Sequence, residues 1–510
     1  MASDSLYAVL DIRERGAFNA RQIANATSLP RSQIEFRVAE LVPNRKIPIV
    51  VYDDDGKRAE LAAATLAQLG YSNVAVLDGG LPAWQEARLP AASGVNVPSK
   101  AFGEHVHHER GIPDISPEEL KSLQSRSTEL MILDMRTPEE FGRFCIPGAI
   151  NVPGGDVVLW ADDLSQKPAG SIIINCAGRT RSIIGTAGLQ RLGLGNVRAL
   201  RNGTMGWVLA GFELELSPVR QTRVASERSR EKGAALALRI AEEEGIPFIS
   251  APEVMSIRKG ADDGVVYLID VRSEAEYGSG HLPGSLNIPG GQAVQRADDF
   301  VAVRNSKIIF VSNKSARAVM AAYWYRQMGF PDVAVLQGGL RGWAESGQSL
   351  AQGTSRTEPL GYDAAAKAVR FIDARELKQE LHNSQVFILD LGSSLDFEAA
   401  HIPGAWWISR GWIEIKLPEH CPDRSQAIVL TCPDDRNSVL AAQALSGIGY
   451  TDVAVLKGGV RAWAKNGHRT EAGLDRCLVE ANDVVLSPSV RDNKEAMQRY
   501  LEWEVKLTGG

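Results

Sequence analysis

The sequence predicts an α/β protein built from four tandem domains, each a parallel β-sheet flanked by helices. An apolar run that ends in aspartate occurs four times, in VLDIRERGAF, ILDMRTPEEF, LIDVRSEAEY and ILDLGSSLDF. A glycine-containing segment before tryptophan also recurs, as LDGGLPAW, RNGTMGW, QGGLRGW and KGGVRAW. The aspartate and tryptophan are always 73 residues apart, at Asp11 and Trp84, Asp134 and Trp207, Asp270 and Trp343, and Asp390 and Trp463. This constant offset indicates one structural unit repeated four times.

A second apolar run lies between these landmarks in each copy, as IPIVVY, SIIINC, KIIFVS or AIVLTC. Each is followed by a short polar loop, a helix-like stretch and a third strand. The position 42 residues after the aspartate is occupied by Asp53, Cys176, Ser312 and Cys432. Because strands alternate with helices, we expect a parallel sheet covered on both faces. The ligand site of such a sheet lies at the carboxyl ends of its strands, beside these four residues.

The spacing of the copies sets the domain boundaries. They are repeat 1 (1–98), repeat 2 (99–218), a charged helical linker (219–244), repeat 3 (245–352), repeat 4 (353–475) and a C-terminal tail with a helix (476–510). The linker separates the chain into two halves, so we expect two pairs, repeats 1 and 2 and repeats 3 and 4. The tail helix is amphipathic and is expected to dock on the last pair or on a second subunit, which leaves a homo-oligomer open.

The composition excludes several function classes. The chain has 510 residues, 44% of them hydrophobic and 23% charged, and a net charge of -6, which is typical of a soluble globular protein. No apolar run reaches the ~18 residues that a membrane span needs, and the first residues lack the pattern of a secretory signal. We therefore expect a cytoplasmic protein with no nucleic-acid or membrane partner. The five cysteines show neither a disulfide framework nor a zinc pattern, so free thiols are expected.

Cys176 is the candidate nucleophile. The pKa of a thiol, ordinarily about 8.5, falls to roughly 3.5–7.5 at helix N-termini and beside cations. The backbone amides of the following residues can surround the sulfur, and the two arginines among them can hold an anionic donor. These candidate substrate-binding residues are Ala177, Gly178, Arg179, Thr180 and Arg181. The alternative for Cys176 is a buried structural thiol.

Cys432 is a weaker candidate. Pro433 removes one amide donor, and the carboxylates of Asp434 and Asp435 would repel a thiolate. Gly392 also stands where the other copies have arginine. Two alternatives stay open: turnover with a cationic or neutral acceptor, or a vestigial site that at most carries sulfur.

The remaining motif residues are expected to support the structure. Asp53 and Ser312 cannot form persulfides, so repeats 1 and 3 should be catalytically silent and should pack against an active neighbour, where they form one wall of its cleft. A ligand site of their own is the alternative. Asp134 and Arg136 are expected to form a structural ion pair, and the four tryptophans to pack. His105, His107 and His108 lie in a polar stretch without a second ligand cluster, so no metal is expected. Cys145 could lie near the site but is not expected to be catalytic.

Together, these motifs resemble the rhodanese family over nearly the whole chain. Repeat 2 contains Asp134-Met135-Arg136, Ile146-Pro147-Gly148-Ala149 and the loop from Cys176 to Ser182, while later repeats keep HLPG and HIPG. The resemblance implies sulfurtransferase activity: a cysteine takes sulfane sulfur from a small anion such as thiosulfate and passes it to a thiol or cyanide. The covalent persulfide needs no cofactor. Two-domain rhodaneses pair a cysteine-less first domain with an active second one, which matches the two expected halves.

Two other functions are alternatives. Related phosphatases and arsenate reductases also use a loop between cysteine and arginine, but theirs has five intervening residues, whereas four separate Cys176 from Arg181. The second alternative is a non-enzymatic persulfide carrier or scaffold whose cysteines report redox state. The basic loop of Cys176 argues against it.

Overall fold

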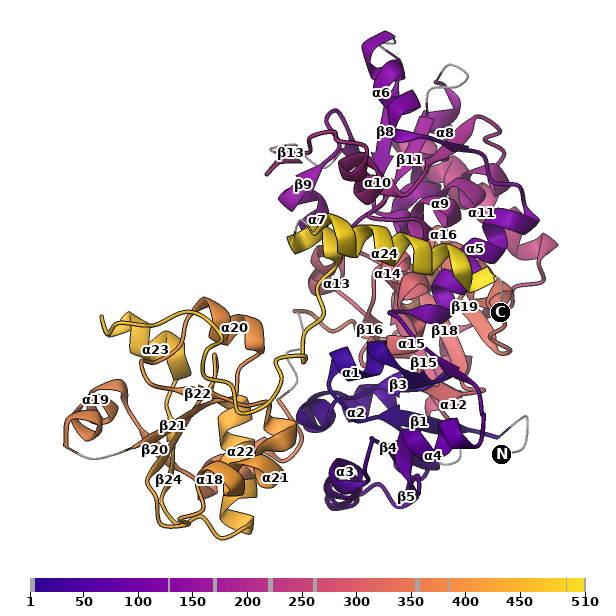
Figure 1. Cartoon of the computed structure of the whole chain (residues 1–510). Coiled ribbons are helices and arrows are strands. Elements are labelled where there is room, and N and C mark those ends of the chain that lie inside the picture. Colours follow the sequence, from indigo (N-terminus) through magenta and orange to yellow (C-terminus); the bar gives the residue numbers. More distant parts are fainter. Residues whose placement is uncertain are drawn as a thin grey trace. The chain divides into compact units, whose positions relative to one another are not determined.

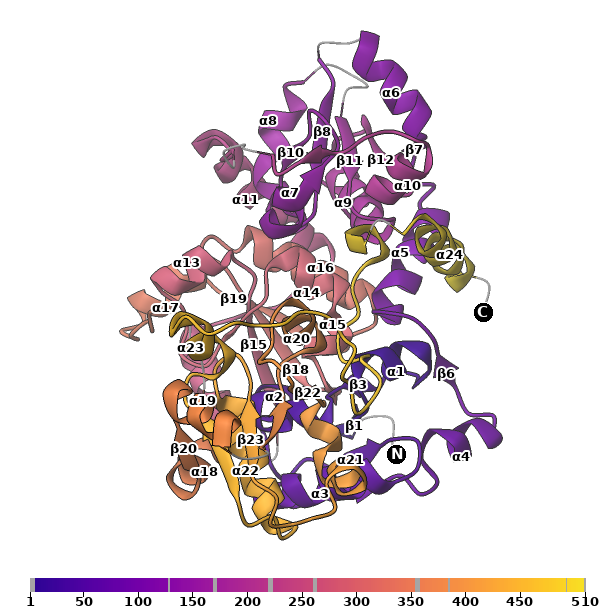
Figure 2. The same cartoon turned by 60° about the vertical axis from the view of Figure 1, so that its left-hand side comes forward.

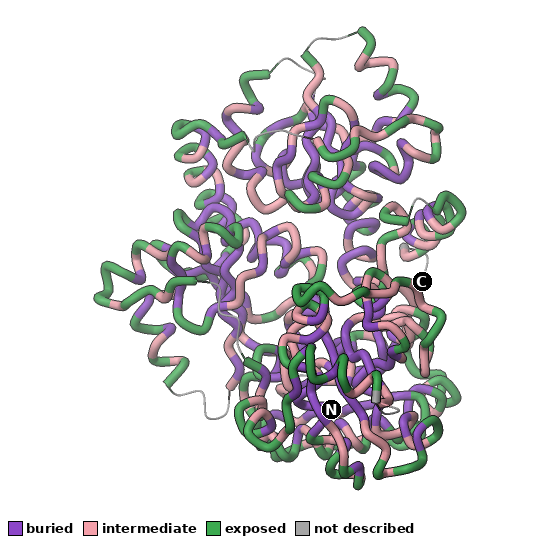
Figure 3. The backbone as a smooth tube through the Cα atoms, turned by 90° about the vertical axis from the view of Figure 1, so that its left-hand side faces the viewer, coloured by how far each residue is buried: buried purple, intermediate pink, exposed green. Residues whose placement is uncertain are grey.

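The computed structural model describes residues 5–126, 129–167, 172–218, 223–259, 264–353, 358–383, 386–491 and 493–508 (Figure 1). Each of the four repeats contains its own parallel β-sheet with helices packed against it, as predicted. The central strands of repeats 2, 3 and 4 are almost completely buried, which is expected where helices cover both faces of a parallel sheet. Figure 3 shows the buried residues in purple and the exposed ones in green along the chain.

The sheet of repeat 2 has the strand order β10-β8-β11-β12-β7, and all its pairings are parallel. Its elements are β7 (Asp114–Ile115), α6 (Pro117–Arg126), β8 (Met131–Asp134), α7 (Pro138–Arg143), β9 (Phe144–Cys145), β10 (Ile150–Asn151), η2 (Gly154–Trp160), α8 (Ala161–Ser165), β11 (Ile172–Asn175), α9 (Thr180–Arg191), β12 (Val197–Leu200), α10 (Gly203–Leu209) and β13 (Glu215–Leu216).

Repeat 3 has the corresponding order β14-β19-β18-β15-β16. Its elements are β14 (Phe248–Ile249), α12 (Ala251–Lys259), β15 (Val266–Asp270), α13 (Glu274–Ser279), β16 (Leu286–Asn287), α14 (Gly290–Gln295), α15 (Ala297–Phe300), β17 (Val303–Arg304), β18 (Lys307–Val311), α16 (Ala316–Gln327), β19 (Val333–Leu336) and α17 (Gly339–Glu345).

Repeat 4 repeats the pattern as β20-β24-β23-β21-β22. Its elements are α18 (Tyr362–Ala368), β20 (Arg370–Ile372), α19 (Ala374–Asn383), β21 (Phe387–Asp390), α20 (Ser394–Ala399), β22 (Trp406–Trp407), η3 (Arg410–Trp412), α21 (Ile413–His420), β23 (Ile428–Thr431), α22 (Arg436–Gly447), β24 (Val453–Leu456) and α23 (Gly459–Lys465).

Repeat 1 is the shortest of the four described copies, and β1, the strand that ends in aspartate, is its first described element. Its sheet contains β3-β1-β4-β5, and its described residues include no counterpart of the short strand and helix that open the other three repeats. Its elements are β1 (Tyr7–Asp11), α1 (Arg15–Ala20), β2 (Gln22–Ile23), β3 (Thr27–Ser28), η1 (Arg31–Gln33), α2 (Ile34–Leu41), β4 (Ile49–Tyr52), α3 (Lys57–Gln68), β5 (Val74–Val76), α4 (Gly80–Glu86) and β6 (Ala91–Ala92).

The recurring glycine has a steric cause. At Gly203, φ is +56°, and a Cβ atom would lie 2.3 Å from the carbonyl oxygen of Cys176. The equivalent atoms at Gly80, Gly339 and Gly459 would lie 2.4, 2.1 and 1.6 Å from the carbonyl oxygen of the residue that follows the central strand. Only glycine lets this helix start against the loop, since φ is positive and no side chain fits.

The recurring tryptophans pack as predicted and share one hydrogen bond. Each indole N–H donates to the backbone carbonyl six residues further along the chain, at distances of 2.8 to 3.1 Å. Trp207, Trp343 and Trp463 are buried, whereas Trp84 of the shortened repeat 1 is only partly covered. The tryptophan therefore fastens the end of each repeat to its core.

The pairing of the repeats differs from the prediction. One compact unit contains repeats 2 and 3 together with residues 486–510, and the other contains repeats 1 and 4. In the second unit, Arg31 pairs with Glu414 and Arg410 pairs with Glu35, so each repeat supplies one arginine to the other. The expected pairs, 1 with 2 and 3 with 4, are therefore wrong.

The linker is helical as predicted, but it does not separate two halves. Helix α11 (Glu227–Glu243) packs against η2 and α8 of repeat 2 and against α16 of repeat 3, inside one unit. A Cβ atom at Gly233 of this helix would lie 2.3 Å from the carbonyl oxygen of Val158, which shows how closely α11 lies on η2.

The C-terminal tail forms the expected helix, preceded by η4 (Pro488–Arg491) and followed by η5 (Lys506–Thr508). This helix, α24 (Lys494–Val505), packs on α5 (Val97–Glu109) and α10, next to repeat 2, in both views (Figures 1 and 2). The expectation that it docks on the last pair is therefore wrong. Among the described residues, no helix is both long and apolar enough to cross a membrane.

Candidate active site at the Cys176 loop

Cys176 follows β11, the strand at the centre of the repeat 2 sheet, and the loop to α9 begins with it. The start of α10 closes the loop from the other side, because the N–H groups of Thr204 and Met205 donate to the carbonyls of Cys176 and Ala177. The cysteine thus lies at the carboxyl end of a parallel sheet, where ligands of such folds bind.

The thiol of Cys176 is buried and makes a hydrogen bond with a serine of the loop. Its Sγ atom lies 3.5 Å from Oγ of Ser182. The Ser182 hydroxyl donates to the carbonyl of Arg179 at 2.8 Å, so in this arrangement the thiol donates to the serine oxygen. Ser182 belongs to the loop motif but was not among the predicted site residues.

Both arginines of the loop are paired with carboxylates, which the sequence did not predict. Arg179 makes two hydrogen bonds to Glu104 of α5, at 2.6 and 2.7 Å. Arg181 makes two to Glu140 of α7, at 2.6 and 2.8 Å. Burial raises the pKa of Glu140, but the charge and hydrogen bonds of Arg181 outweigh it and lower the value to about 2. Neither arginine is therefore free to hold a donor in this arrangement.

Helix α24 adds a third charged pair to the loop. Glu504 is completely buried; its Oε1 accepts from the hydroxyl of Thr180 at 2.7 Å and from Nζ of Lys100 at 3.2 Å. The Tyr500 hydroxyl also contacts Lys100. Oε2 of Glu504 has no hydrogen-bond partner among the described residues, and it would lie 3.2 Å from a Cβ atom at Gly178.

The charges around the loop therefore balance. Lys100, Arg179 and Arg181 each face one carboxylate, from Glu504, Glu104 and Glu140. The three carboxylates differ in their freedom, because the side chain of Glu140 is 35% exposed, whereas those of Glu104 and Glu504 are each 1% exposed. Only the Arg181–Glu140 pair can open without exposing a deeply buried carboxylate.

Asp134 and Arg136 form the predicted ion pair. Both are buried, with an Nη2–Oδ2 distance of 2.8 Å, and Arg136 also donates to the carbonyl of Phe144. The amide of Asn175, the last residue of β11, donates to Asp134 at 2.9 Å. The pair therefore ties β8 and β11 to the turn after α7, close to the Cys176 loop. Cys145 lies in the apolar core of repeat 2, away from the loop contacts.

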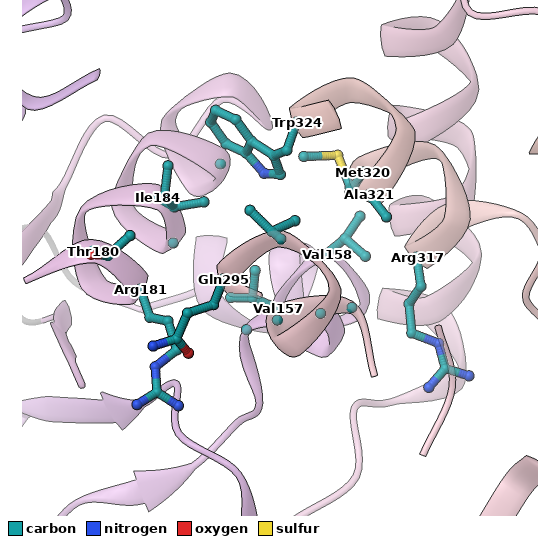
Figure 4. A pocket seen from close by; sticks show the side chains of 17 residues that line it. Val157, Val158, Thr180, Arg181, Ile184, Gln295, Arg317, Met320, Ala321 and Trp324 are labelled. Carbon is teal, nitrogen blue, oxygen red and sulfur yellow. The ribbon is translucent and has the colours of Figure 1, made fainter. Parts of the chain in front are cut away.

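An apolar cavity of about 50 Å³ lies beside the loop, between α9 of repeat 2 and α16 of repeat 3 (Figure 4). Ile184, Met320 and Trp324 line it, together with glycines of both repeats. Thr180 and Arg181 lie at one side of it and Arg317 at the other, and both guanidinium groups extend away from the apolar side chains (Figure 4). The site of repeat 2 is thus continuous with the contact to repeat 3.

Cys432 lies at the equivalent place in repeat 4, in different electrostatic surroundings. Burial raises the pKa of its thiol to about 11, although the backbone N–H groups of Ser438 and Asp434 act in the opposite direction. Asp390 contributes to the rise, and burial raises its own pKa to about 7. Gly392 gives this carboxylate only its backbone N–H.

The two acidic residues of the Cys432 loop act differently from the prediction. The carboxylate of Asp434 pairs with Arg436, and that of Asp435 accepts from the Tyr362 hydroxyl and the Gly458 N–H. Both are held by partners within the unit. The unfavourable environment of Cys432 therefore arises first from burial and from Asp390.

Three residues of α5, Glu104, His107 and His108, place potential metal-ligand atoms within 4.8 Å of one another. Both oxygens of Glu104 are occupied by Arg179, and His107 lies 3.8 Å from Asp114. His105 is exposed. A cation here would have to displace a buried arginine, so these residues fit a metal poorly.

The four copies of the motif match one known family. The family "Rhodanese-like domain" matches residues 1–87, 116–210, 253–346 and 373–466. The chain belongs to the rhodanese family. A crystal structure of a thiosulfate sulfurtransferase from Pseudomonas aeruginosa is 37% identical, with a TM-score of 0.91, and the match covers 99% of this chain and 94% of that one.

Shorter matches come from curated rhodanese relatives. "Putative thiosulfate sulfurtransferase SseB" of Mycobacterium tuberculosis is 37% identical over 128 residues, which are 23% of this chain and 43% of that protein. "Uncharacterized protein YibN" of Escherichia coli is 32% identical over 87 residues, 17% of this chain and 61% of that protein. This chain thus spans less than two thirds of each relative. The comparisons confirm the predicted family and its sulfurtransferase-like enzyme class.

Proposed function

We propose that this rhodanese transfers sulfane sulfur from thiosulfate, or a related anion, to a thiol or cyanide through a persulfide on Cys176. The observation that carries the proposal is the position of Cys176, at the carboxyl end of the central strand and at the start of a loop that glycine packing holds closed. The full-length similarity to a thiosulfate sulfurtransferase supports the choice of donor.

The first half of the reaction loads the cysteine. The Cys176 thiolate attacks the sulfane sulfur of thiosulfate, a new S–S bond forms, and the bond to the sulfonate sulfur breaks. Sulfite leaves with the electron pair, and the enzyme keeps a persulfide anion. No general base is needed once the thiol is ionised.

The second half unloads it. A thiolate or cyanide attacks the terminal sulfur of the persulfide, the S–S bond to Cys176 breaks, and its electron pair restores the Cys176 thiolate. The products are the persulfide of the acceptor thiol or thiocyanate. The sulfur atom is transferred twice, from the donor to Cys176 and from Cys176 to the acceptor. Neither step needs an external oxidant or reductant, so the covalent persulfide is the intermediate and no cofactor takes part.

Arg181 is the group that would hold the donor. In the described arrangement its charge is compensated by Glu140, which is partly exposed and can turn toward water. When Glu140 turns away, the guanidinium of Arg181 can donate two parallel hydrogen bonds to the sulfonate of the donor. Arg179 stays in place through the buried Glu104 and shapes the loop.

The other repeats contribute differently to this reaction. Asp53 and Ser312 have no thiol, and the raised pKa of Cys432 disfavours its thiolate, so repeat 2 performs the transfer. We place the reaction in the cytoplasm, where reduced thiol acceptors are available.

Turnover by two matched variants tests the proposal. With thiosulfate and cyanide, Cys176→Ser should lower thiocyanate formation at least about a thousandfold, because the nucleophile is removed. Cys432→Ser, the same replacement in the equivalent loop, should keep the rate of the unaltered chain. Full activity of the Cys176 variant would refute the assignment.

A further inference from the structure

In repeat 1, the loop after the central strand surrounds the carboxylate of its own residue Asp53. Asp53 is completely buried, and its carboxylate accepts the backbone N–H groups of Gly56, Arg58 and Ala59 at 2.5, 2.9 and 3.3 Å. The loop between the central strand and its helix is thus built so that its amides converge on oxygen atoms. In this fold, a carboxylate fits where repeat 2 has its thiol.

Repeat 3 has the same loop without the carboxylate. Ser312 replaces Asp53, and the three amides correspond to those of Ser315, Arg317 and Ala318. Only the Ala318 N–H reaches the Ser312 hydroxyl, at a long 3.4 Å. Among the described residues, the backbone N–H groups of Ser315 and Arg317 have no hydrogen-bond acceptor. The hydroxyl proton of Ser312 also has none there, and Ser312 is only 2% exposed. Buried donors of this kind are costly when left unpaired.

A cavity of about 320 Å³ lies beside this loop, and Ser312 and Arg317 are among the residues that line it. One wall is formed by residues 312–314, 316 and 317, and Leu159 and Trp160 of η2 form another. The start of α11 closes the third side. Its volume lies in the range of small-molecule sites, which is about 300–1,000 Å³. All of these residues belong to the unit of repeats 2 and 3.

The charges around this cavity leave one cation in excess. Its lining contains four cations and three carboxylates: Arg223, Arg230, Lys314 and Arg317 with Asp156, Glu227 and Glu276. Arg317 is satisfied by Glu276 and Asp156, whereas one carboxylate, Glu227, serves both Arg230 at 2.6 Å and Lys314 at 3.6 Å. Arg223 has no carboxylate partner within the described part of the chain, and the Nε atom of Arg230 is buried without an acceptor. The cavity is therefore suited to a negative ligand.

We propose that the Ser312 loop and this cavity bind a small oxyanion without covalent chemistry. One ligand oxygen would take the position that the Asp53 carboxylate fills in repeat 1, accepting from the free amides and the Ser312 hydroxyl. Arg223 would balance its charge at the mouth. The site lies in a repeat without a nucleophile, so the proposal goes beyond sulfur transfer at Cys176 and does not depend on it.

The decisive variant is Ser312→Asp, which fills the loop with its own carboxylate as repeat 1 does. Sulfate and acetate are the probes, one tetrahedral and one planar, titrated separately in a chloride buffer while tryptophan fluorescence is followed, since Trp160 lines the cavity. We expect saturable binding of at least one probe by the unaltered chain and at least a tenfold loss of affinity in Ser312→Asp. Ser349→Asp, which places the same charge at an exposed residue of repeat 3, should bind as the unaltered chain does.

If Ser312→Asp folds poorly, a second variant and a crystallographic measurement still test the proposal. Arg223→Gln alters an exposed side chain and should weaken binding several-fold without affecting folding. Crystals soaked in selenate, a heavier analogue of sulfate, should show anomalous density at the amides of residues 315 and 317. Three results would overturn the proposal: both variants, Ser312→Asp and Arg223→Gln, bind the probes with the affinity of the unaltered chain; neither probe shows saturable binding; or selenate appears only at other loops.

Discussion

Repeats 2 and 4 place a cysteine at the same position of the same fold, yet the two thiols have different surroundings. Asp134, near Cys176, is neutralised by Arg136 in a buried ion pair. Asp390, near Cys432, has Gly392 in the arginine position, so burial raises its pKa to about 7. The comparison teaches that the arginine two residues after this aspartate compensates the charge of a buried carboxylate near the cysteine, and that repeat 4 lacks this compensation.

Restoring that arginine should give the largest change. Burial raises the pKa of Cys432 to about 11, so its alkylation rate in the unaltered chain should increase about tenfold for each pH unit as the pH rises toward that value. Gly392→Arg combined with Pro433→Ala should neutralise Asp390 and return an amide to the loop. Both replacements are needed, because a Cβ at Gly392 would lie 3.0 Å from Pro433.

The measurement is the pH profile of iodoacetamide labelling at the Cys432 peptide. In the double variant, the profile should move to lower pH by about one unit, which makes labelling near pH 7 about tenfold faster. Pro433→Ala alone is the control and should produce a smaller shift. An unchanged profile in the double variant would show that Asp390 does not control this thiol.

A smaller effect is expected at the Arg181–Glu140 pair of repeat 2. Glu140→Gln keeps the side-chain shape but removes the charge that compensates Arg181, so the KM for thiosulfate should fall about two- to fivefold, as an ion pair near the surface contributes up to about 1 kcal/mol. The kcat with saturating cyanide should change little. Glu139→Gln, at the exposed neighbouring residue, serves as the control.

Acid unfolding tests the same pair independently. Because the folded pKa of Glu140 is lowered to about 2, the pair stabilises the fold above the ordinary carboxyl pKa of about 4.3, and this contribution is lost as the pH falls through 2. The stability difference between Glu140→Gln and the unaltered chain should therefore shrink between pH 4 and pH 2. An unchanged KM and a pH-independent difference would together contradict the proposed role of this pair.

The repeat, the parallel sheet within it and the positions of the cysteines could be predicted from sequence because they depend on local patterns. The offset from Asp134 to Trp207 is fixed by a domain core, and Gly203 recurs because one carbonyl lies where its side chain would be. The ion pair between Asp134 and Arg136 could also be predicted, because the two residues are only two positions apart in the sequence.

The pairing of repeats and the carboxylates at the site could not be predicted in this way. Repeats 1 and 4 are joined by ion pairs such as Arg410–Glu35, whose members lie 375 residues apart in unrelated sequence contexts. Glu104 and Glu504 reach the Cys176 loop from helices that do not belong to the repeated motif. The sequence did contain a signal for Glu140, because Glu276 occupies the equivalent position in repeat 3 and forms an ion pair with Arg317 there.

The central claim is that sulfur is carried on Cys176 and that the similar thiol of repeat 4 is silent. Peptide mass spectrometry of the unaltered chain after incubation with thiosulfate, without an acceptor, tests it most directly. The account predicts one additional sulfur atom on the peptide that contains Cys176, and none on the peptide that contains Cys432. Sulfur on Cys432 with none on Cys176 would contradict it.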